Sequence, residues 1–229
     1  MNRFATLTTP HVADACVRLG IPLRVAPPGL RAVTDGDRLA GRVLPVRHVG
    51  SVDLYLEALE AALPGDVLVV DNEGRTDEAC VGDLVAIEVQ QAGLAGILIW
   101  GLHRDTVDIR AIGLPVLSLG ATPPGPTRVD VRPTDALIAA HVGDHVVTTA
   151  DVVLADEDGA IFVPADRLDE VFTTAEGMRD TERAQAVSIA AGVSLRSQVR
   201  FGDYLAAREV NPTLTFREHL RTVGGEIEV

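Results

Sequence analysis

An arginine and an aspartate stand side by side at Arg104-Asp105, shortly after the apolar run 97–99. A guanidinium forms paired hydrogen bonds to a carboxylate, and an aspartate oxygen is a hard ligand of the kind that Mg²⁺ and Mn²⁺ prefer. At the exit of a strand, these two side chains could hold an anionic substrate and a divalent metal together. The alternative is a surface ion pair without function, which is usually worth less than about 1 kcal/mol.

The segment Gly82-Asp83-Leu84-Val85 has the composition of a helix start. We predict a helix over 84–91 with Asp83 as its N-cap, a role in which a carboxylate accepts a backbone N–H and stabilises the helix by about 1 kcal/mol. That role alone would explain Asp83. In the functional interpretation, the N–H groups of Leu84 and Val85 lie free at the helix N-terminus and bind a carboxylate or phosphate, and Gly82 lets this ligand approach closely.

The elements around these residues must bring them together. The runs 67–70 and 97–99 are continuous, aliphatic and bounded by turn residues, which is typical of strands covered on both faces. A strand, the 84–91 helix and a second strand form a crossover with parallel pairing. Ligands of such folds collect beyond the carboxyl ends of the strands, where Arg104 and the helix start at Asp83 would both lie.

The remaining pattern predicts a mixed α/β fold with a parallel core and an antiparallel hairpin. Pro45 places the 38–49 strand at an edge or a bulge, because proline cannot donate to a sheet. We expect one domain over 1–229, since no shift in composition marks a boundary. The other predicted elements are a helix from Thr9-Pro10 to a stop at Gly20, helices over 53–63 and 165–191, a strand over 112–119, and a hairpin of 151–155 with 160–163.

Several nearby polar residues are given structural roles. His103 should point away from Arg104, because neighbouring residues of an extended chain face opposite sides. Trp100 should pack at the end of its strand. The run 71–74 could line the cleft but is better explained as a polar turn, and the Asp156-x-Asp158-Gly159 run lacks the other ligand positions of a calcium loop.

Composition excludes several classes of protein. A net charge of -13 and 3% aromatic residues argue against a nucleic-acid partner. Cys16 and Cys80 form neither a disulfide framework nor a zinc motif, and no apolar run approaches the roughly 18 residues of a membrane helix. We therefore expect a cytoplasmic protein that binds neither nucleic acid nor membrane. No nucleotide-binding or serine hydrolase motif is present.

The stretch from Gly82 to Asp105 resembles the RraA-like family, which includes the class II, metal-dependent 4-hydroxy-4-methyl-2-oxoglutarate/4-carboxy-4-hydroxy-2-oxoadipate aldolases. The family pattern Gly-(Glu/Asp)-Leu-x-Ala, a helix, Gly-x-x-Gly, an apolar strand and Asp-Gly-x-x-Arg-Asp aligns here without a gap. Weaker matches are Asp14-Ala15, the 64–71 run, the 156–164 hairpin and the closing segments 216–220 and 224–228. The resemblance thus extends over nearly the whole chain.

The resemblance implies roles for individual residues. Arg104 would hold the carboxylate of a pyruvyl unit, with contacts from the N–H groups of Leu84 and Val85. Asp105 would ligate Mg²⁺ or Mn²⁺, and Asp83 would act on the metal through water. A carboxylate from a neighbouring subunit would contribute, with Glu182 as the nearest candidate. Trp100-Gly101 replaces the family's usual Asp-Gly, which predicts an altered pocket floor or altered hydrogen bonding nearby.

The family further implies a compact, swivelling α/β/β/α domain assembled as a trimer or hexamer, with the C-terminal tail at a subunit interface. The implied reaction is cleavage of a 2-oxo acid to a pyruvate enolate, either as a retro-aldol reaction or as oxaloacetate decarboxylation. Decarboxylation needs only stabilisation of the enolate, so it should tolerate a poor substrate fit better. The alternative is a regulator that resembles RraA, binds a ribonuclease and inhibits it without catalysis.

Overall fold

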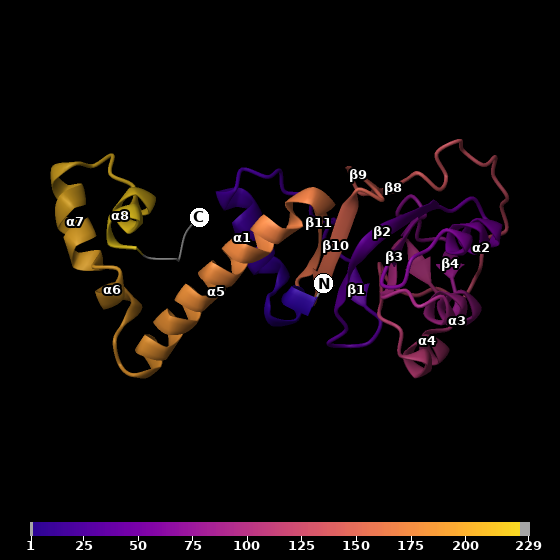
Figure 1. The fold of residues 1–229 in the computed structure, drawn as a ribbon, viewed down its shortest axis with the longest axis horizontal. Helices are drawn as coiled ribbons and strands as arrows, with labels where there is room; N and C mark the ends of the chain where they lie inside the picture. Colours follow the sequence, from indigo (N-terminus) through magenta and orange to yellow (C-terminus); the bar gives the residue numbers. More distant parts are fainter. Residues whose placement is uncertain (1, 225–229) are drawn as a thin grey trace. The chain divides into compact units, whose positions relative to one another are not determined.

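The computed structural model describes residues 2–224, and the predicted match at 225–228 lies outside them. The chain divides into two compact units, and their helices and strands are drawn in Figure 1. The first consists of Met1–Pro10 and Leu23–Asp169, and the second of His11–Pro22 and Glu170–Val229. Among the described residues, no helix is both long and apolar enough to cross a membrane.

A seven-stranded sheet forms the centre of the first unit, in the order β1-β7-β5-β3-β2-β10-β11. Its core of β2, β3, β5 and β7 is parallel, and β1, β10 and β11 are added antiparallel. The predicted α/β class with a parallel core and an antiparallel hairpin is therefore confirmed. The strands are β1 (Arg31–Ala32), β2 (Leu39–Arg47), β3 (Val67–Asp71), β5 (Gly96–Trp100), β7 (Val116–Ser118), β10 (Asp151–Asp156) and β11 (Gly159–Pro164).

Alternation along the central strands gives the sheet two apolar faces. In β3, Leu68 and Val70 pack into one core cluster with residues of α2, α3 and α4, whereas Val67 and Val69 pack into a second cluster with residues of β8 and β9. All residues of β3 are buried, as its unbroken apolar run predicts. The covering elements are α2 (Asp53–Glu60), α3 (Asp83–Gln91), α4 (Thr106–Ile112), β8 (Ala139–Val142) and β9 (His145–Thr148).

The prediction of an edge or bulged strand over 38–49 is wrong, because β2 pairs with β3 on one side and β10 on the other, each in unbroken register. The two pairings cover different lengths of the strand. The antiparallel pairing with β10 involves only the residues from Leu39 to Arg42, whereas Pro45 pairs with Val69 of β3. Pro45 thus lies in the half of β2 that β10 leaves free, where a missing N–H costs little.

The smaller elements largely follow the pattern of the sequence. The predicted hairpin is confirmed, with Asp156 opposite Gly159 at its tip, where Asp156 accepts hydrogen bonds from Thr9 and from the N–H of Asp158. The strand predicted over 112–119 is shorter, since α4 continues to Ile112. A separate two-stranded sheet pairs β4 (Ala79–Val81) with β6 (Leu102–His103) in parallel.

The second unit is helical. Its long helix α5 (Leu168–Ala190) matches the predicted helical segment, and α1 (Thr9–Arg18) precedes Gly20 as expected. The polar C-terminal region was not assigned elements from its sequence, yet it forms three helices. These are α6 (Leu195–Gln198), α7 (Phe201–Val210) and α8 (Phe216–Val223), the last starting with a capping box between Thr215 and Glu218.

Candidate active site

The small sheet of β4 and β6 places the two halves of the predicted site next to each other. Its parallel strands end together, and the N–H of Arg104 donates to the carbonyl of Val81 at 2.9 Å. Gly82 and Arg104 therefore leave neighbouring strands on the same side. This is the carboxyl-end position at which ligands of parallel sheets collect.

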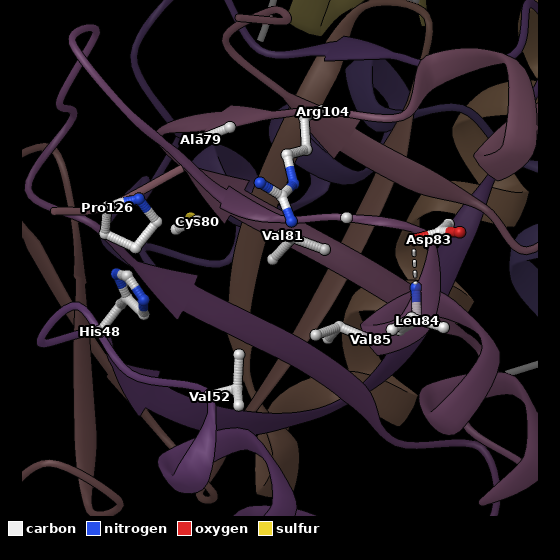
Figure 2. A pocket seen from close by; sticks show the side chains of 11 residues that line it. His48, Val52, Ala79, Cys80, Val81, Asp83, Leu84, Val85, Arg104 and Pro126 are labelled. Atoms are coloured by element: carbon white, nitrogen blue, oxygen red, sulfur yellow. Dashed lines mark hydrogen bonds between the residues drawn. The ribbon is translucent and has the colours of Figure 1, made fainter. Parts of the chain in front are cut away.

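A pocket opens at this position and brings most of the predicted residues together (Figure 2). Its volume is about 140 Å³, below the roughly 300–1,000 Å³ of sites for drug-sized ligands, so it suits a ligand of few atoms. The lining residues are His48, Val52, Ala79, Cys80, Val81, Gly82, Asp83, Leu84, Val85, Arg104 and Pro126.

Arg104 is the one arginine among these lining residues. Its side chain is 49% exposed, so the guanidinium is available to a ligand, and its Nε lies 3.3 Å from Oδ2 of Asp105. Two glycines leave room for this pair. A Cβ atom on Gly82 would lie 2.5 Å from Oδ2 of Asp105, and one on Gly125 would lie 2.9 Å from Nη1 of Arg104.

Asp105 adopts the left-handed conformation, with φ of 59° and ψ of 41°, immediately before α4. Aspartate tolerates this region better than most residues, and such conformations gather at functional sites. Asp105 lines a shallower hollow that it shares with Arg104 and Thr106. The predicted Arg-Asp pair is thus assembled, with Asp105 on the outer side of the arginine.

The predicted cap of α3 is wrong by one residue. Gly82 is the N-cap and Asp83 is the first helical residue, and the N–H of Leu84 donates to Oδ1 of Asp83 at 2.8 Å. The N–H of Leu84 is therefore already engaged rather than free. Because the first turn of a helix has no intrahelical acceptors, the N–H of Val85 is the better candidate for an anionic ligand.

Few carboxylates lie near Arg104. Among residues 2–224, no group of three or more histidine, cysteine, aspartate or glutamate side chains could enclose a metal. Asp105, with Asp83 at the same strand ends, offers one or two carboxylates. This donor set fits Mg²⁺, which is commonly bound by one or two carboxylates and keeps several waters. Glu182 lies in the helical unit, where its Oε2 is 3.2 Å from Nε2 of His11.

The inner wall of the pocket carries residues that the sequence did not single out. His48 follows β2 directly and is buried, and its Nδ1 lies 3.0 Å from Oδ1 of Asn72. Arg128 donates to the same Asn72 oxygen at 2.9 Å and to Glu78 at 2.8 Å. Burial lowers the pKa of His48. The hydrogen bond from His48 to Asn72 opposes this shift, and the positive charge of Arg128 adds to it. The ring therefore favours its neutral form.

Cys80 also lines the pocket, but its environment does not activate it. Burial raises the pKa of its thiol to about 12, so the nucleophilic thiolate is scarce near neutral pH. Its carbonyl accepts a hydrogen bond from the hydroxyl of buried Tyr55, whose ring stacks on His48 with centroids 5.5 Å apart. Cys80 and Tyr55 form a packed support for the inner wall.

His103 and Trp100 both pack within the fold. His103 is buried and its two ring nitrogens contact hydroxyls of Ser118 and Thr106, whereas Arg104 reaches the pocket, as predicted. Trp100 packs at the strand end, and a Cβ atom on Gly74 would lie 3.0 Å from its ring. Trp100 is not among the residues that line the pocket of Figure 2.

The run 71–74 is the polar turn that was expected. Asp71 is buried and accepts hydrogen bonds from the N–H groups of Glu73 and His141. None of its four residues lines the pocket directly, but two of them bond to His48, Asp71 through its carbonyl and Asn72 through its side chain. A sequence signal for His48 existed, since it directly follows an apolar strand, but the edge assignment of that strand concealed it.

Comparisons with known proteins identify relatives of this chain. A Halalkalibacterium halodurans protein provisionally named as a 4-hydroxy-4-methyl-2-oxoglutarate aldolase is 25% identical over 191 residues, covering 82% of this chain and 88% of that protein. A crystal structure of Streptomyces coelicolor RraAS2, described as an unusual member of the RNase ES inhibitor RraA family, is 27% identical with a TM-score of 0.70. It covers 80% of this chain and 92% of that one.

An uncharacterized protein from Pseudomonas syringae pv. tomato shares the fold, with a TM-score of 0.72 and 24% identity. The alignment covers 85% of this chain and 94% of that one. The RraA-like family profile, described as Aldolase/RraA, matches residues 9–162, which include both strands of the small sheet and every pocket residue. On this match, which covers well over half of the sequence, the chain belongs to the RraA-like family.

Proposed function

We propose that this protein is a divalent-metal-dependent carbon-carbon lyase that acts on 2-oxo acids through a pyruvate enolate. The observation that carries the proposal is the position of Arg104, which lines one small pocket with Gly82 and the first turn of α3 and also contacts Asp105. A guanidinium and a helix N-terminus both attract carboxylates, and an adjacent carboxylate attracts a metal.

In this proposal, each residue acts on one part of the substrate. Arg104 binds the carboxylate of the pyruvyl unit, and the N–H of Val85 adds a second contact. Asp105 would hold Mg²⁺ or Mn²⁺, with Asp83 contributing through water, and the bound metal would supply Lewis-acid stabilisation of the enolate. Val52 and Val81 add apolar side chains to the lining of the pocket.

Two reactions share this enolate. Retro-aldol cleavage of a 4-hydroxy-2-oxo acid fits the name of the Halalkalibacterium relative. Oxaloacetate decarboxylation would use the same contacts from Arg104 and the metal, and it needs no base to remove a hydroxyl proton. We propose that the protein has both activities, with decarboxylation less sensitive to the rest of the substrate.

We further propose that the protein acts as a homotrimer or hexamer in which Glu182 of a neighbouring subunit completes the site. The proposal is supported by the small number of carboxylates that one chain provides around Arg104. Light scattering coupled to size-exclusion chromatography measures the oligomeric state. A monomeric enzyme with full activity would contradict this part of the proposal.

The direct test is pyruvate release from oxaloacetate and from 4-hydroxy-4-methyl-2-oxoglutarate with Mg²⁺ or Mn²⁺. Arg104→Ala should lower kcat/KM by about 10- to 100-fold, since a hydrogen bond to a charged group contributes about 1.5–3 kcal/mol. Arg196→Ala, an exposed arginine on α6, serves as the matched control and should leave the rate unchanged. No metal-dependent reaction, or equal rates for both variants, would rule the proposal out.

A second candidate is a non-catalytic regulator of a ribonuclease, supported by the description of the Streptomyces relative. The two functions are separated by a ribonuclease inhibition assay run beside the pyruvate assay. Inhibition that persists in Arg104→Ala, without any pyruvate release by the unmodified protein, would favour the regulator.

A further inference from the structure

His48 occupies a position that the proposed mechanism has not yet used. It is one of the side chains lining the inner wall of the pocket, beside Pro126 and across from Arg104 (Figure 2). It stands at the carboxyl end of β2, and Asn72 stands at the carboxyl end of the adjacent strand β3. Side chains at the ends of neighbouring parallel strands are where α/β folds place their ligand contacts.

The contacts of Asn72 fix which atom faces His48. A guanidinium carries donors only, so the Asn72 atom at 2.9 Å from Nη2 of Arg128 must be the oxygen Oδ1. If the Asn72 amide were flipped, its Nδ2 would face Nη2 of Arg128, and two donors would lie against each other. Asn72 keeps this orientation even though its buried Nδ2 has no hydrogen-bond partner among the described residues.

This orientation determines the tautomer of His48. Oδ1 of Asn72 is an acceptor, so Nδ1 of His48, at 3.0 Å, must be the donor. In the neutral ring the other nitrogen, Nε2, then carries a lone pair. Nε2 has no hydrogen bond to any residue that the structure describes, and the ring borders the pocket.

Burial, more than the nearby charges, favours the neutral state of the ring. Arg128 is paired with Glu78 and Asp130, so Glu78, whose Oε1 is 4.0 Å from Nδ1 of His48, is already engaged. Tyr55 holds the ring by stacking against it at an interplanar angle of 6°. The inner wall thus presents a fixed, neutral acceptor to a ligand that Arg104 anchors.

We propose that Nε2 of His48 accepts a hydrogen bond from the substrate hydroxyl and takes its proton in the retro-aldol reaction of a 4-hydroxy-2-oxo acid. The inference rests on the proposed function. As the C3–C4 bond breaks, the electrons of the O–H bond form the new carbonyl and those of the C–C bond form the enolate. Nε2 then returns the proton to the enolate carbon, which gives pyruvate. Oxaloacetate has no such hydroxyl and does not need this step.

The tautomer is tested first, independently of catalysis. Long-range ¹H–¹⁵N spectra of the labelled full-length protein should show His48 protonated at Nδ1 and unprotonated at Nε2, with Asn72→Ala changing this pattern. A ring protonated at Nε2, or protonated at both nitrogens at neutral pH, overturns the inference whatever the protein catalyses.

The second test compares two rates in the same samples. His48→Phe keeps a ring to stack on Tyr55 but removes the acceptor. It should lower retro-aldol cleavage of 4-hydroxy-4-methyl-2-oxoglutarate by about 10²- to 10⁴-fold, the usual contribution of a general base, and lower oxaloacetate decarboxylation far less. His48→Gln is the second variant if the phenylalanine protein does not fold, and His145→Gln is the control.

The outcomes separate the two proposals. A fall in the ratio of retro-aldol to decarboxylation rates supports the role of His48. An unchanged ratio overturns it, whether both rates fall together or both persist. If the unmodified protein catalyses neither reaction with Mg²⁺ or Mn²⁺, the proposed lyase function itself is wrong, and the role of His48 with it.

Discussion

At the scale of single residues, Gly82 determines whether the Arg104-Asp105 pair can form. Its φ is -129°, which any residue adopts, so its lack of a side chain matters for space rather than for backbone freedom. A Cβ atom there would lie 2.5 Å from Oδ2 of Asp105 and 3.3 Å from Nε of Arg104. The carboxylate, rather than the backbone, would have to move.

Gly82→Ala should therefore impair the site more than the fold. We expect the metal-dependent activity to fall by more than about tenfold, while the free energy of unfolding changes by less than about 1 kcal/mol, as for most changes that displace only a partly exposed side chain. Urea unfolding and the pyruvate assay measure the two effects.

The matched control is Gly177→Ala, within α5. A Cβ atom on Gly177 meets nothing within 4 Å, so alanine should raise stability by roughly 0.5–1 kcal/mol and leave activity unchanged. A fully active Gly82→Ala protein would show that the position of the Asp105 carboxylate does not matter.

At the scale of elements, the site depends on the junction between β6 and α4. Asp105 occupies this junction in the left-handed region, and its carbonyl accepts the first backbone hydrogen bond of α4, from Ile109. Asparagine shares the tolerance of aspartate for this conformation, whereas residues without a short polar side chain pay about 1–2 kcal/mol. Substitution of Asp105 by asparagine thus removes the negative charge and keeps the backbone conformation, so the two effects can be measured separately.

Asp105→Asn should keep α4 in place but lose the metal. We expect its stability to stay within about 0.5 kcal/mol of the unmodified protein, because the exposed pair with Arg104 is weak. Loss of a residue that only supports a metal ligand typically lowers metal affinity by about 10- to 100-fold. Loss of the ligand Asp105 itself should lower the affinity for Mg²⁺ or Mn²⁺ by at least as much. Asp105→Ala should lose stability as well. Unchanged metal dependence of Asp105→Asn would remove Asp105 from the site.

The sequence predicted those elements whose signals are local. The apolar run of β3, the α3 start near Asp83 and the hairpin tip at Asp156 each carry their own pattern, and all three are present. The position of β2 was not predictable, because whether Pro45 disrupts a sheet depends on where a distant strand, β10, stops pairing. The wrong edge assignment also concealed His48, and the contacts of its ring with Asn72 and, through Asn72, with Arg128 come from residues remote in sequence.

At the scale of the whole molecule, two buried histidines make stability depend on pH. Burial lowers the pKa of both His48 and His103. The unfolded chain therefore binds protons on these groups at a higher pH than the folded protein does. Above the ordinary histidine pKa of about 6.5, both histidines are neutral in the folded and the unfolded protein, so their burial does not reduce the free energy of unfolding. Below that pH the unfolded chain takes up protons on them, and the folded protein loses stability.

We expect the urea concentration at the unfolding midpoint to decrease as the pH is lowered from about 7.5 to about 5.5, the range in which unperturbed histidines titrate. His103→Gln removes the one of these two histidines that does not line the pocket. Its urea midpoint should decrease less over the same pH range. Unfolding curves at several pH values compare the two proteins. An equal slope would mean that His103 does not contribute to the pH dependence.

The chain carries a net charge of -13, yet the proposed substrate is an anion. A single guanidinium in a cleft can outweigh the mean field of the surface locally, so the negative net charge does not exclude an anionic substrate. The central claim is therefore that Arg104 and a metal at Asp105 stabilise a pyruvate enolate. Exchange of the methyl protons of pyruvate in D₂O reports formation of this enolate without knowledge of the full substrate.

The decisive measurement is the decay of the pyruvate methyl signal in ¹H NMR with protein and Mg²⁺ or Mn²⁺. We predict metal-dependent exchange that stops with a chelator and is strongly reduced in Arg104→Ala but not in Arg196→Ala. No exchange above the protein-free rate, or exchange that does not depend on Arg104, would contradict the enolate mechanism.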